Sequence, residues 1–477
     1  MLELSRKVRL WLAVIGLLLL AGTRLPALTA LPLHNDEGLH LTRAVQVWNL
    51  KPFWEIGDGK IVNHWLIAAF YPQNAPDFAG RVATVFVALI GLAAGIAIGS
   101  RYGTYAGWLV IALWVGSPYL FFYERTALSD AEAGAFVCLT LWAALRLARS
   151  NALRDAVLTG FALALAALFK LTAAPFAALP VLIVMLAGRG AWWGRIGRLA
   201  IVGAVVVACF AVPVGYLVWR GGNFGIAGAW LAGGSGSLPL VANFVQNIGR
   251  LWEAFTGFGG GLGWASAIVI GAGVGFAIST RPALAAAVMV PFAALLVIGV
   301  EPMPRHWVVS LPAFIVLSAV SLGGLVQRIG GRRGVHVVGS TVGIVLACFV
   351  PFAAAAYTAP ATLTLPPLDR EQFISGHPSG YGLREAMIAL PSLVPPNTDV
   401  VADMFPDSCR RANFYALPGY SLRCIDLAVL HAGQGGAAYV LAEKPPIGLT
   451  YDAQGAQVIS EFPRPQGNSP VTLWRVR

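Results

Sequence analysis

Long apolar runs alternate with short polar segments along the chain as far as residue 357. A bilayer core about 30 Å thick needs roughly 20 residues of helix to cross it. This window predicts eleven apolar helices, two of them short, as in a polytopic α-helical membrane protein. They cover residues 8–28, 82–100, 104–122, 131–148, 155–170, 173–187, 199–219, 263–279, 283–300, 307–324 and 335–357.

The polar segments between and after these runs differ in character. Leu41–Leu50 and Ile61–Phe70 are amphipathic and are expected to lie along the membrane interface. Residues 220–262 are Gly-rich and predict a loop, either a connector or a gate for substrate. After Ala359 the pattern predicts a helix at Leu383–Leu393 and strands at 399–404, 421–426, 437–443, 457–462 and 471–476.

We therefore expect two domains. Residues 1–357 form a transmembrane domain, and residues 358–477 form a small soluble α/β domain outside the cytoplasm. The composition agrees, because 57% of residues are hydrophobic, only 12% are charged and the mean hydropathy is +0.71. The first apolar run resembles a signal peptide, but no convincing small-residue cleavage site follows, so we interpret it as a retained helix.

The distribution of charge predicts the orientation. The net charge is +11, yet no aromatic residues interleave with a basic stripe, so a nucleic-acid partner is not expected. Arg and Lys instead gather in alternate loops, where the only acids are Glu3 and Asp155. The positive-inside rule then places the N-terminus in the cytoplasm of a multi-pass inner (plasma) membrane protein. The segments on the outer face are 31–81, 124–132, 220–262, 301–306 and the C-terminal tail.

Candidate chemistry gathers on that outer face, beginning with the loop Leu31–His40. Asp36 and Glu37 directly follow the first apolar run, where carboxylates are costly unless they are compensated. Cations and further acids recur at other helix ends, and together they suit an anionic group bound beside a base, such as a phosphate carried on a lipid. These residues are Lys60, His64, Arg81, Arg125, Asp130, Lys170, Arg305 and His306.

Simpler interpretations exist for most of these residues. Asn35 and Asp36 precede an amphipathic run and could cap a helix, and Asp130 suits the positive end of the fourth span. The cations could anchor to lipid headgroups at the interface, and Lys170 could extend its ammonium to water. The residues alone leave these interpretations open.

A metal site and a disulfide are also left open. His34, His40 and His64, with the two neighbouring acids, are suitable ligands for a divalent cation, but their spacing matches no compact metal motif. Cys409 and Cys424 lie in the polar tail and could pair in an oxidising compartment, although the sequence does not show that their Cα atoms are close.

Several motifs together resemble the GT-C superfamily of membrane glycosyltransferases. They are NDEG after the first run, GK before an aromatic-containing helix, R-x-x-x-x-D at Arg125 and Asp130, LFKLTAAPFAALP, and RHWVVSLP at Arg305–Pro312. In order and spacing they cover about residues 10–325. The chain is most similar to the bacterial members related to protein O-mannosyltransferases and the lipid A aminoarabinose transferase.

The resemblance implies roles for individual residues. Asp36 is the expected catalytic base, Glu37 is its neighbour in the motif, and Asp130 shapes the same site. Lys60 occupies the place of a lysine that contacts the lipid phosphate, with Arg125, Arg305 and His306 as further partners and His64, Lys170 and Arg81 as additional candidates. Ile61 stands where relatives often have proline, and His306 where an aromatic residue is common, so the phosphate contacts differ in detail.

The implied reaction moves a sugar, a hexose or a pentose, from a polyprenyl-phosphate donor to an acceptor hydroxyl with inversion. The acceptor is a glycolipid, a polysaccharide or a protein, and no cofactor is required, with a divalent cation as the alternative. No nucleotide-binding Gly-rich motif is visible, which suits a lipid-borne donor. The alternatives are a lipid-linked-sugar transporter or flippase, for which we find no convincing internal repeat, and a non-catalytic polyprenyl-phosphate-binding protein.

Overall fold

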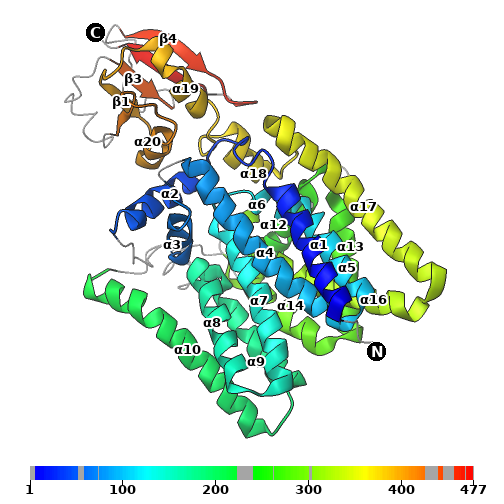
Figure 1. Cartoon of the computed structure of the whole chain (residues 1–477). Helices are drawn as coiled ribbons and strands as arrows, with labels where there is room; N and C mark the ends of the chain where they lie inside the picture. Colours follow the sequence, from blue (N-terminus) through cyan, green and yellow to red (C-terminus); the bar gives the residue numbers. More distant parts are fainter. Residues whose placement is uncertain are drawn as a thin grey trace.

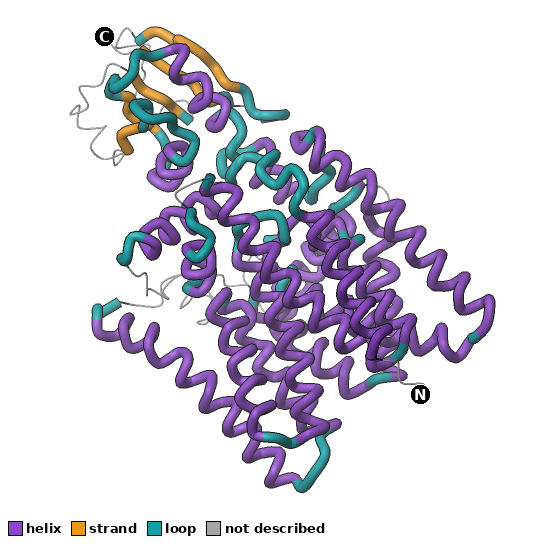
Figure 2. Tube along the Cα trace, viewed as in Figure 1, coloured by secondary structure: helices purple, strands orange, loops and turns teal. Residues whose placement is uncertain are grey.

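The computed structural model describes residues 6–51, 59–72, 75–222, 240–260, 263–299, 303–424, 439–443, 456–467 and 469–475. A helical bundle makes up most of it, with a small sheet beyond one end (Figure 1). Figure 2 shows that the strands, in orange, gather only there. The N-terminal end of α1 lies at the opposite end of the bundle from the sheet (Figure 1).

The long helices of the bundle follow the predicted apolar runs in order. Six of them, α4, α7, α10, α13, α16 and α17, are long and apolar enough to cross a membrane. The chain is therefore a multi-pass helical membrane protein, while the count of eleven spans stays a prediction. The bounds are α1 (Arg6–Arg24), α4 (Pro76–Tyr102), α5 (Thr104–Val115), α7 (Ser129–Ser150), α8 (Leu153–Phe169), α9 (Ala178–Ala187), α10 (Trp192–Trp219), α13 (Gly263–Thr280), α14 (Pro282–Ile298), α16 (Leu311–Ile329) and α17 (Gly331–Thr358).

Shorter helical segments connect these helices. Two of them, α2 and α3, contain the amphipathic segments that were expected at the interface. The bounds are α2 (Asn35–Trp48), α3 (Val62–Ala68), α6 (Pro118–Tyr123), η1 (Leu171–Ala177), α15 (Pro304–Trp307), η3 (Pro360–Thr362), α18 (Pro367–Arg370) and η4 (Glu371–Ser375).

The helix predicted over 104–122 is broken in the structure. α5 ends at Val115, and α6 begins anew at Pro118. Proline has no backbone N–H and cannot continue the hydrogen-bond ladder, but it is tolerated in the first turn of a new helix. The Ser117 hydroxyl accepts a hydrogen bond from the Leu120 N–H at 3.2 Å and so caps α6.

The prediction of a loop over 220–262 is wrong for residues 240–257, which form helix α12 (Leu240–Gly257). Residues 223–239, which hold most of the Gly-rich sequence, lie outside the described residues. The Asn243 and Asn247 amides each donate to the Gly299 carbonyl, at 3.0 and 2.8 Å. They thereby satisfy a carbonyl that the end of α14 leaves without a partner, and this fixes α12 to α14.

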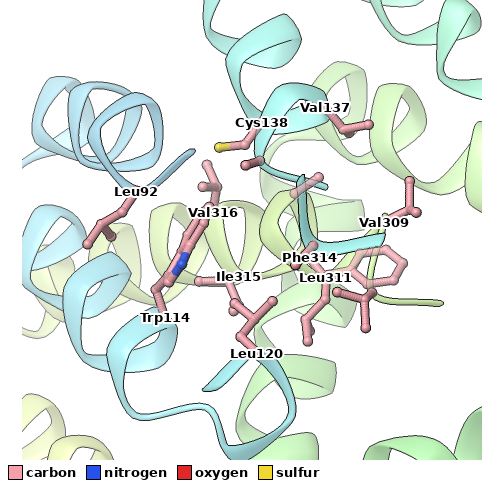
Figure 3. Packing of buried hydrophobic residues seen from close by; sticks show 14 of the residues in the cluster. Leu92, Trp114, Leu120, Val137, Cys138, Val309, Leu311, Phe314, Ile315 and Val316 are labelled. Atoms are coloured by element: carbon pink, nitrogen blue, oxygen red, sulfur yellow. The ribbon is translucent and has the colours of Figure 1, made fainter. Parts of the chain in front are cut away.

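The core of the bundle is apolar and closely packed. In Figure 3, Trp114 of α5 lies among Leu92, Cys138 and Val316, which come from three other helices. All four side chains are completely buried. Small residues let the helices approach, since a Cβ added at Gly91 of α4 would lie 2.7 Å from the Ala135 Cβ of α7.

The C-terminal region is a small α/β unit, as predicted. Among the described residues of this unit, five strands lie in the order β2-β1-β3-β5-β4, with β1 parallel to β2 and β3, and β5 antiparallel to β3 and β4. The bounds are α19 (Leu383–Leu393), β1 (Val400–Asp403), α20 (Pro406–Asn413), β2 (Leu422–Cys424), β3 (Tyr439–Ala442), β4 (Gln457–Phe462) and β5 (Val471–Arg475).

Helix α20 did not emerge from the sequence pattern, and it settles the pairing of two cysteines. Cys409 of α20 and Cys424 of β2 form a disulfide, with Cα atoms 5.7 Å apart. The other face of α20 packs on α2, where a Cβ added at Gly38 would lie 2.7 Å from the Cβ of Arg411. The α/β unit therefore docks directly on the helix that begins with the acidic motif.

We predict that Gly38→Ala destabilises this contact. The added methyl group has no room beside Arg411, and overpacking of this kind costs about 1–3 kcal/mol. Thermal unfolding of the purified protein in detergent should show a lower midpoint. Gly22→Ala in α1 is the matched control, because a Cβ there meets nothing within 4 Å. Equal midpoints for the two variants would show that α2 and α20 are not held closely together.

Candidate active site

The acidic motif begins α2 and is fixed there by Glu37. The His34 N–H donates to Glu37 Oε2 at 2.8 Å, while the Asp36 N–H donates to His34 Nδ1 at 3.1 Å. These two bonds form a capping box, so the cap is His34 and not Asn35 or Asp36. Burial lowers the pKa of His34 to about 4, so its imidazole is neutral and Nδ1 can accept.

Glu37 also forms a buried ion pair with Arg81 of α4. The guanidinium donates to both carboxylate oxygens, at 2.9 Å from Nε and 2.8 Å from Nη2, and neither side chain is exposed. The Ala127 N–H donates to the same carboxylate at 2.7 Å. Burial opposes ionisation, but Arg81 and these donors hold the pKa of Glu37 below its ordinary value. Its four acceptor positions are thus filled by protein.

Arg81 uses its remaining donors on the chain that leads to the motif. They bond to the carbonyls of Leu28, Leu31 and Pro32, at 2.9, 2.7 and 3.1 Å. Every N–H of the guanidinium is therefore engaged within the protein. These contacts favour a structural role for Glu37 and Arg81, whereas the motif alone suggested catalysis and phosphate binding.

Asp36 points in another direction and remains partly open. Its Oδ2 accepts from Arg305 Nη1 of α15 at 2.8 Å, and the two side chains are 26% and 14% exposed. Burial would raise the pKa of Asp36, but the charges of Arg305 and Lys60 outweigh it and hold the pKa well below its ordinary value. Asp36 is therefore an ionised and partly exposed carboxylate in contact with a cation.

A second ion pair lies next to the first. Lys170, at the break between α8 and η1, bonds through Nζ to Asp130 Oδ1 in the first turn of α7. Lys170 is only 7% exposed, so the interpretation as a lysine that extends to water is wrong. Burial lowers the pKa of Arg305, but the charges of Asp36 and Asp130 raise it above its ordinary value, which shows that the two pairs are neighbours.

Lys60 is brought to this cluster by backbone pairing. The Leu171 N–H donates to the Gly59 carbonyl and the Ile61 N–H to the Leu168 carbonyl, both at 3.0 Å. Gly59 has φ +76°, a left-handed conformation that glycine adopts readily, and a Cβ there would lie 3.3 Å from Leu171. Lys60 thus lies beside Lys170, and its Nζ is 3.3 Å from His40 Nε2.

The other predicted phosphate partners differ in position. His306 is buried in α15, where burial holds its pKa well below the ordinary value and Nδ1 accepts from the Met303 N–H at 3.2 Å. Arg125 donates to three backbone carbonyls, of Arg24, Pro26 and Ala27, at 2.5, 2.7 and 2.8 Å. No described contact brings Arg125 to Asp36. His64 is buried, with its ring centroid 5.1 Å from that of His40.

Residues on the C-terminal side of the site were not predicted from the sequence. Gln372 Oε1 lies 3.0 Å from His34 Nε2, and the Phe373 ring lies 4.6 Å from the His34 ring. The Tyr123 hydroxyl donates to Asp369 at 2.8 Å, and burial raises the pKa of that carboxyl to about 7. Asp369, Gln372 and Phe373 lie between α17 and α19, where the sequence pattern predicted no helix or strand.

The described residues contain no group of three or more His, Cys, Asp and Glu side chains placed to hold a metal ion. The histidines near the motif are engaged in other contacts. His34 caps α2, and His40 bonds to Asn63 and faces Lys60. Within the described residues, therefore, the divalent-cation alternative has no supporting geometry.

No protein-family model and no curated protein matches this sequence. Solved structures do match it. The crystal structure of ArnT from Cupriavidus metallidurans bound to undecaprenyl phosphate matches with a TM-score of 0.65, at 13% identity over 99% of both chains. ArnT in the apo state matches with a TM-score of 0.58, at 16% identity over 98% of this chain and 97% of that one.

A third match is the Archaeoglobus fulgidus oligosaccharyltransferase in complex with Zn and sulfate. Its TM-score is 0.52, at 11% identity over 90% of this chain and 67% of the other. These proteins are GT-C glycosyltransferases, so the chain has the fold of that class, as its motifs indicated. With ArnT, the lipid A aminoarabinose transferase, the similarity extends over nearly the whole chain, including the C-terminal region.

We predict that Glu37→Gln is strongly destabilising. The substitution leaves the Arg81 charge buried without its counter-ion, which typically costs 3–5 kcal/mol, so the protein should unfold at a clearly lower temperature. Asp399→Asn is the control, since its ion pair with Arg423 is nearly half exposed and worth about 1 kcal/mol or less. A Glu37→Gln midpoint as high as that of the control would contradict the anchoring role.

Proposed function

We propose that this protein is an inverting glycosyltransferase that uses a polyprenyl-phosphate sugar at the outer face of the inner membrane. The observation that carries the proposal is the contact between the partly open carboxylate of Asp36 and Arg305, with Lys60 and Lys170 close by. An inverting transfer needs a base beside the attacking hydroxyl and positive charge beside the leaving phosphate. The fold, shared with ArnT bound to undecaprenyl phosphate, supports the same class of donor.

In the proposed reaction, Asp36 takes the proton from the acceptor hydroxyl. The oxygen forms a bond to the anomeric carbon as the bond from that carbon to the phosphate oxygen breaks. The electron pair of the broken bond stays on the polyprenyl phosphate, which leaves with one more negative charge. Arg305 and Lys60 stabilise that charge, and Lys170, paired with Asp130, adds to the positive field.

The ion pair with Arg305 weakens Asp36 as a base, and donor binding would remove this effect. A carboxylate whose pKa is held low by Arg305 is a weak base. A donor phosphate that bonds to Arg305 would compete with Asp36 for the same guanidinium, because Arg binds phosphate well. Asp36 would then regain basicity only when a donor is present, which limits wasteful reaction of an empty site.

The positions of the two domains suit a site at the outer face of the membrane. With the N-terminus in the cytoplasm, the α/β unit at the other end of the bundle would lie outside it, as the charge distribution predicted (Figure 1). We assign residues 1–357 to the transmembrane domain and 358–477 to the outer domain. The outer domain contacts the motif directly, since the Leu33 N–H donates to the Tyr415 hydroxyl oxygen at 2.7 Å and the Asn35 N–H donates to the Pro378 carbonyl at 3.0 Å.

We predict that Asp36→Asn lowers the rate of sugar transfer by about 10²–10⁴-fold, the usual contribution of a general base. Purified protein in lipid would be given a panel of polyprenyl-phosphate sugars with a membrane extract as acceptor, and mass spectrometry would follow the transferred sugar and the released polyprenyl phosphate. Asp399→Asn, at an exposed position, is the control. Binding of undecaprenyl phosphate by Asp36→Asn should remain.

Three other outcomes would contradict the proposal. Equal transfer by wild type and Asp36→Asn would remove Asp36 from catalysis. Donor binding by wild type without transfer to any acceptor in the extract would favour a non-catalytic binding protein. Movement of a lipid-linked sugar across the bilayer without transfer would favour a flippase.

A further inference from the structure

A chain of buried side chains leads from Lys60 into the bundle. Lys60 Nζ lies 3.3 Å from His40 Nε2. The other ring nitrogen of His40, Nδ1, bonds to Asn63 Oδ1, and Asn63 Nδ2 donates to Glu132 Oε2 at 2.7 Å. The chain therefore joins the segment before α3 to α2, α3 and α7 in turn.

Burial makes these contacts energetically important. His40, Asn63 and Glu132 are each 0% exposed. A buried polar group costs several kcal/mol unless it is hydrogen-bonded, and a buried carboxylate costs more. Three such groups on three helices therefore destabilise the fold unless they bond to one another. At the other end of the chain, His40 contacts Lys60, which is already part of the candidate site.

The orientation of the Asn63 side chain sets the direction of each hydrogen bond. The amide nitrogen of Asn63 faces Glu132 and donates to it, so the amide oxygen faces His40. His40 must then carry its proton on Nδ1, which leaves a lone pair on Nε2. That lone pair faces the ammonium of Lys60, which can only donate.

We propose that His40, Asn63 and Glu132 are positioning residues that fix the Lys60 ammonium where the donor phosphate binds. This inference rests on the proposed function, in which Lys60 is a phosphate partner. A lysine side chain is flexible, and ordering it on binding loses rotamer entropy. The acceptor on His40 orders the ammonium beforehand, so less of this cost is left for donor binding.

A second hydrogen bond of Glu132 offers a matched control for the variant at Asn63. Its second oxygen, Oε1, accepts from the Thr84 hydroxyl of α4 at 3.1 Å, a bond that does not lie on the route to Lys60. Thr84 is as completely buried as Asn63. A variant at Thr84 therefore disturbs the same carboxylate in the same core but leaves the route from Glu132 to Lys60 complete.

The test measures binding of undecaprenyl phosphate to the full-length protein in lipid nanodiscs. We expect Lys60→Ala and Asn63→Leu each to weaken binding by about tenfold, as the loss of a hydrogen bond to a charged group typically does. The double variant should bind no more weakly than Lys60→Ala alone, because without Lys60 there is nothing left to position. Thr84→Val should bind within about twofold of wild type. Glu132→Gln replaces Asn63→Leu if the latter fails to fold.

The outcomes separate this inference from the proposed function. Absence of binding by wild type would overturn both. Binding by wild type that Lys60→Ala does not weaken would overturn the role of Lys60 and therefore its positioning. If Asn63→Leu weakened binding by the same factor with and without Lys60, its effect would be a general structural one. That outcome would overturn the positioning role but not the proposed function. The same conclusion would follow if Thr84→Val weakened binding as much as Asn63→Leu.

Discussion

The buried pair of Glu37 and Arg81 is the interaction on which the site depends. One carboxylate and one guanidinium join α2, α4, the turn before α7 and the chain from Leu28 to Pro32. Both groups have their bonding capacity filled, which is the condition under which a buried ion pair is tolerated. The loop that follows the first helix is thereby held in one conformation, although it lies at the end of the bundle where chains are usually mobile.

Adjacent acids in the motif consequently have different tasks. Glu37 faces inward and is enclosed, whereas Asp36 faces the cluster of cations and is 26% exposed. Successive residues of a helix point about 100° apart, so a rigid Glu37 also sets the direction of its neighbour. The outer domain adds a second constraint, since Arg411 of α20 packs on Gly38 and donates to the Leu33 carbonyl at 3.3 Å. In our proposal the base is therefore fixed from both sides.

Much of the fold could be predicted because it follows from local patterns. The apolar runs predicted the order of the long helices. Helical periodicity predicted α19, and alternation predicted five short strands close to their observed bounds. The pattern failed where local composition misleads. Gly-rich sequence around α12 suggested a loop, and α20, which is short and mostly polar, was not recognised. The break between α5 and α6 was missed because apolar residues continue through it.

The candidate site was predictable only in part, for a different reason. Residue type and motif order selected Asp36, Lys60, Asp130 and Arg305, but pairing depends on contacts between positions far apart in the chain. Lys170 bonds to a residue 40 positions away, and Asn63 reaches Glu132 over 69 positions. No periodicity encodes such contacts. For the same reason Arg125 looked like a phosphate partner, although its donors are used by carbonyls at the end of α1.

In the proposed reaction, the donor phosphate replaces Asp36 as the partner of Arg305. An experimental structure of the protein with undecaprenyl phosphate in nanodiscs tests this replacement most directly. We expect the phosphate to lie within hydrogen-bond distance of Arg305 and Lys60. Asp36 Oδ2 and Arg305 Nη1, which are 2.8 Å apart without it, should have separated. A phosphate bound elsewhere, with the Asp36–Arg305 pair intact, would contradict the proposed replacement.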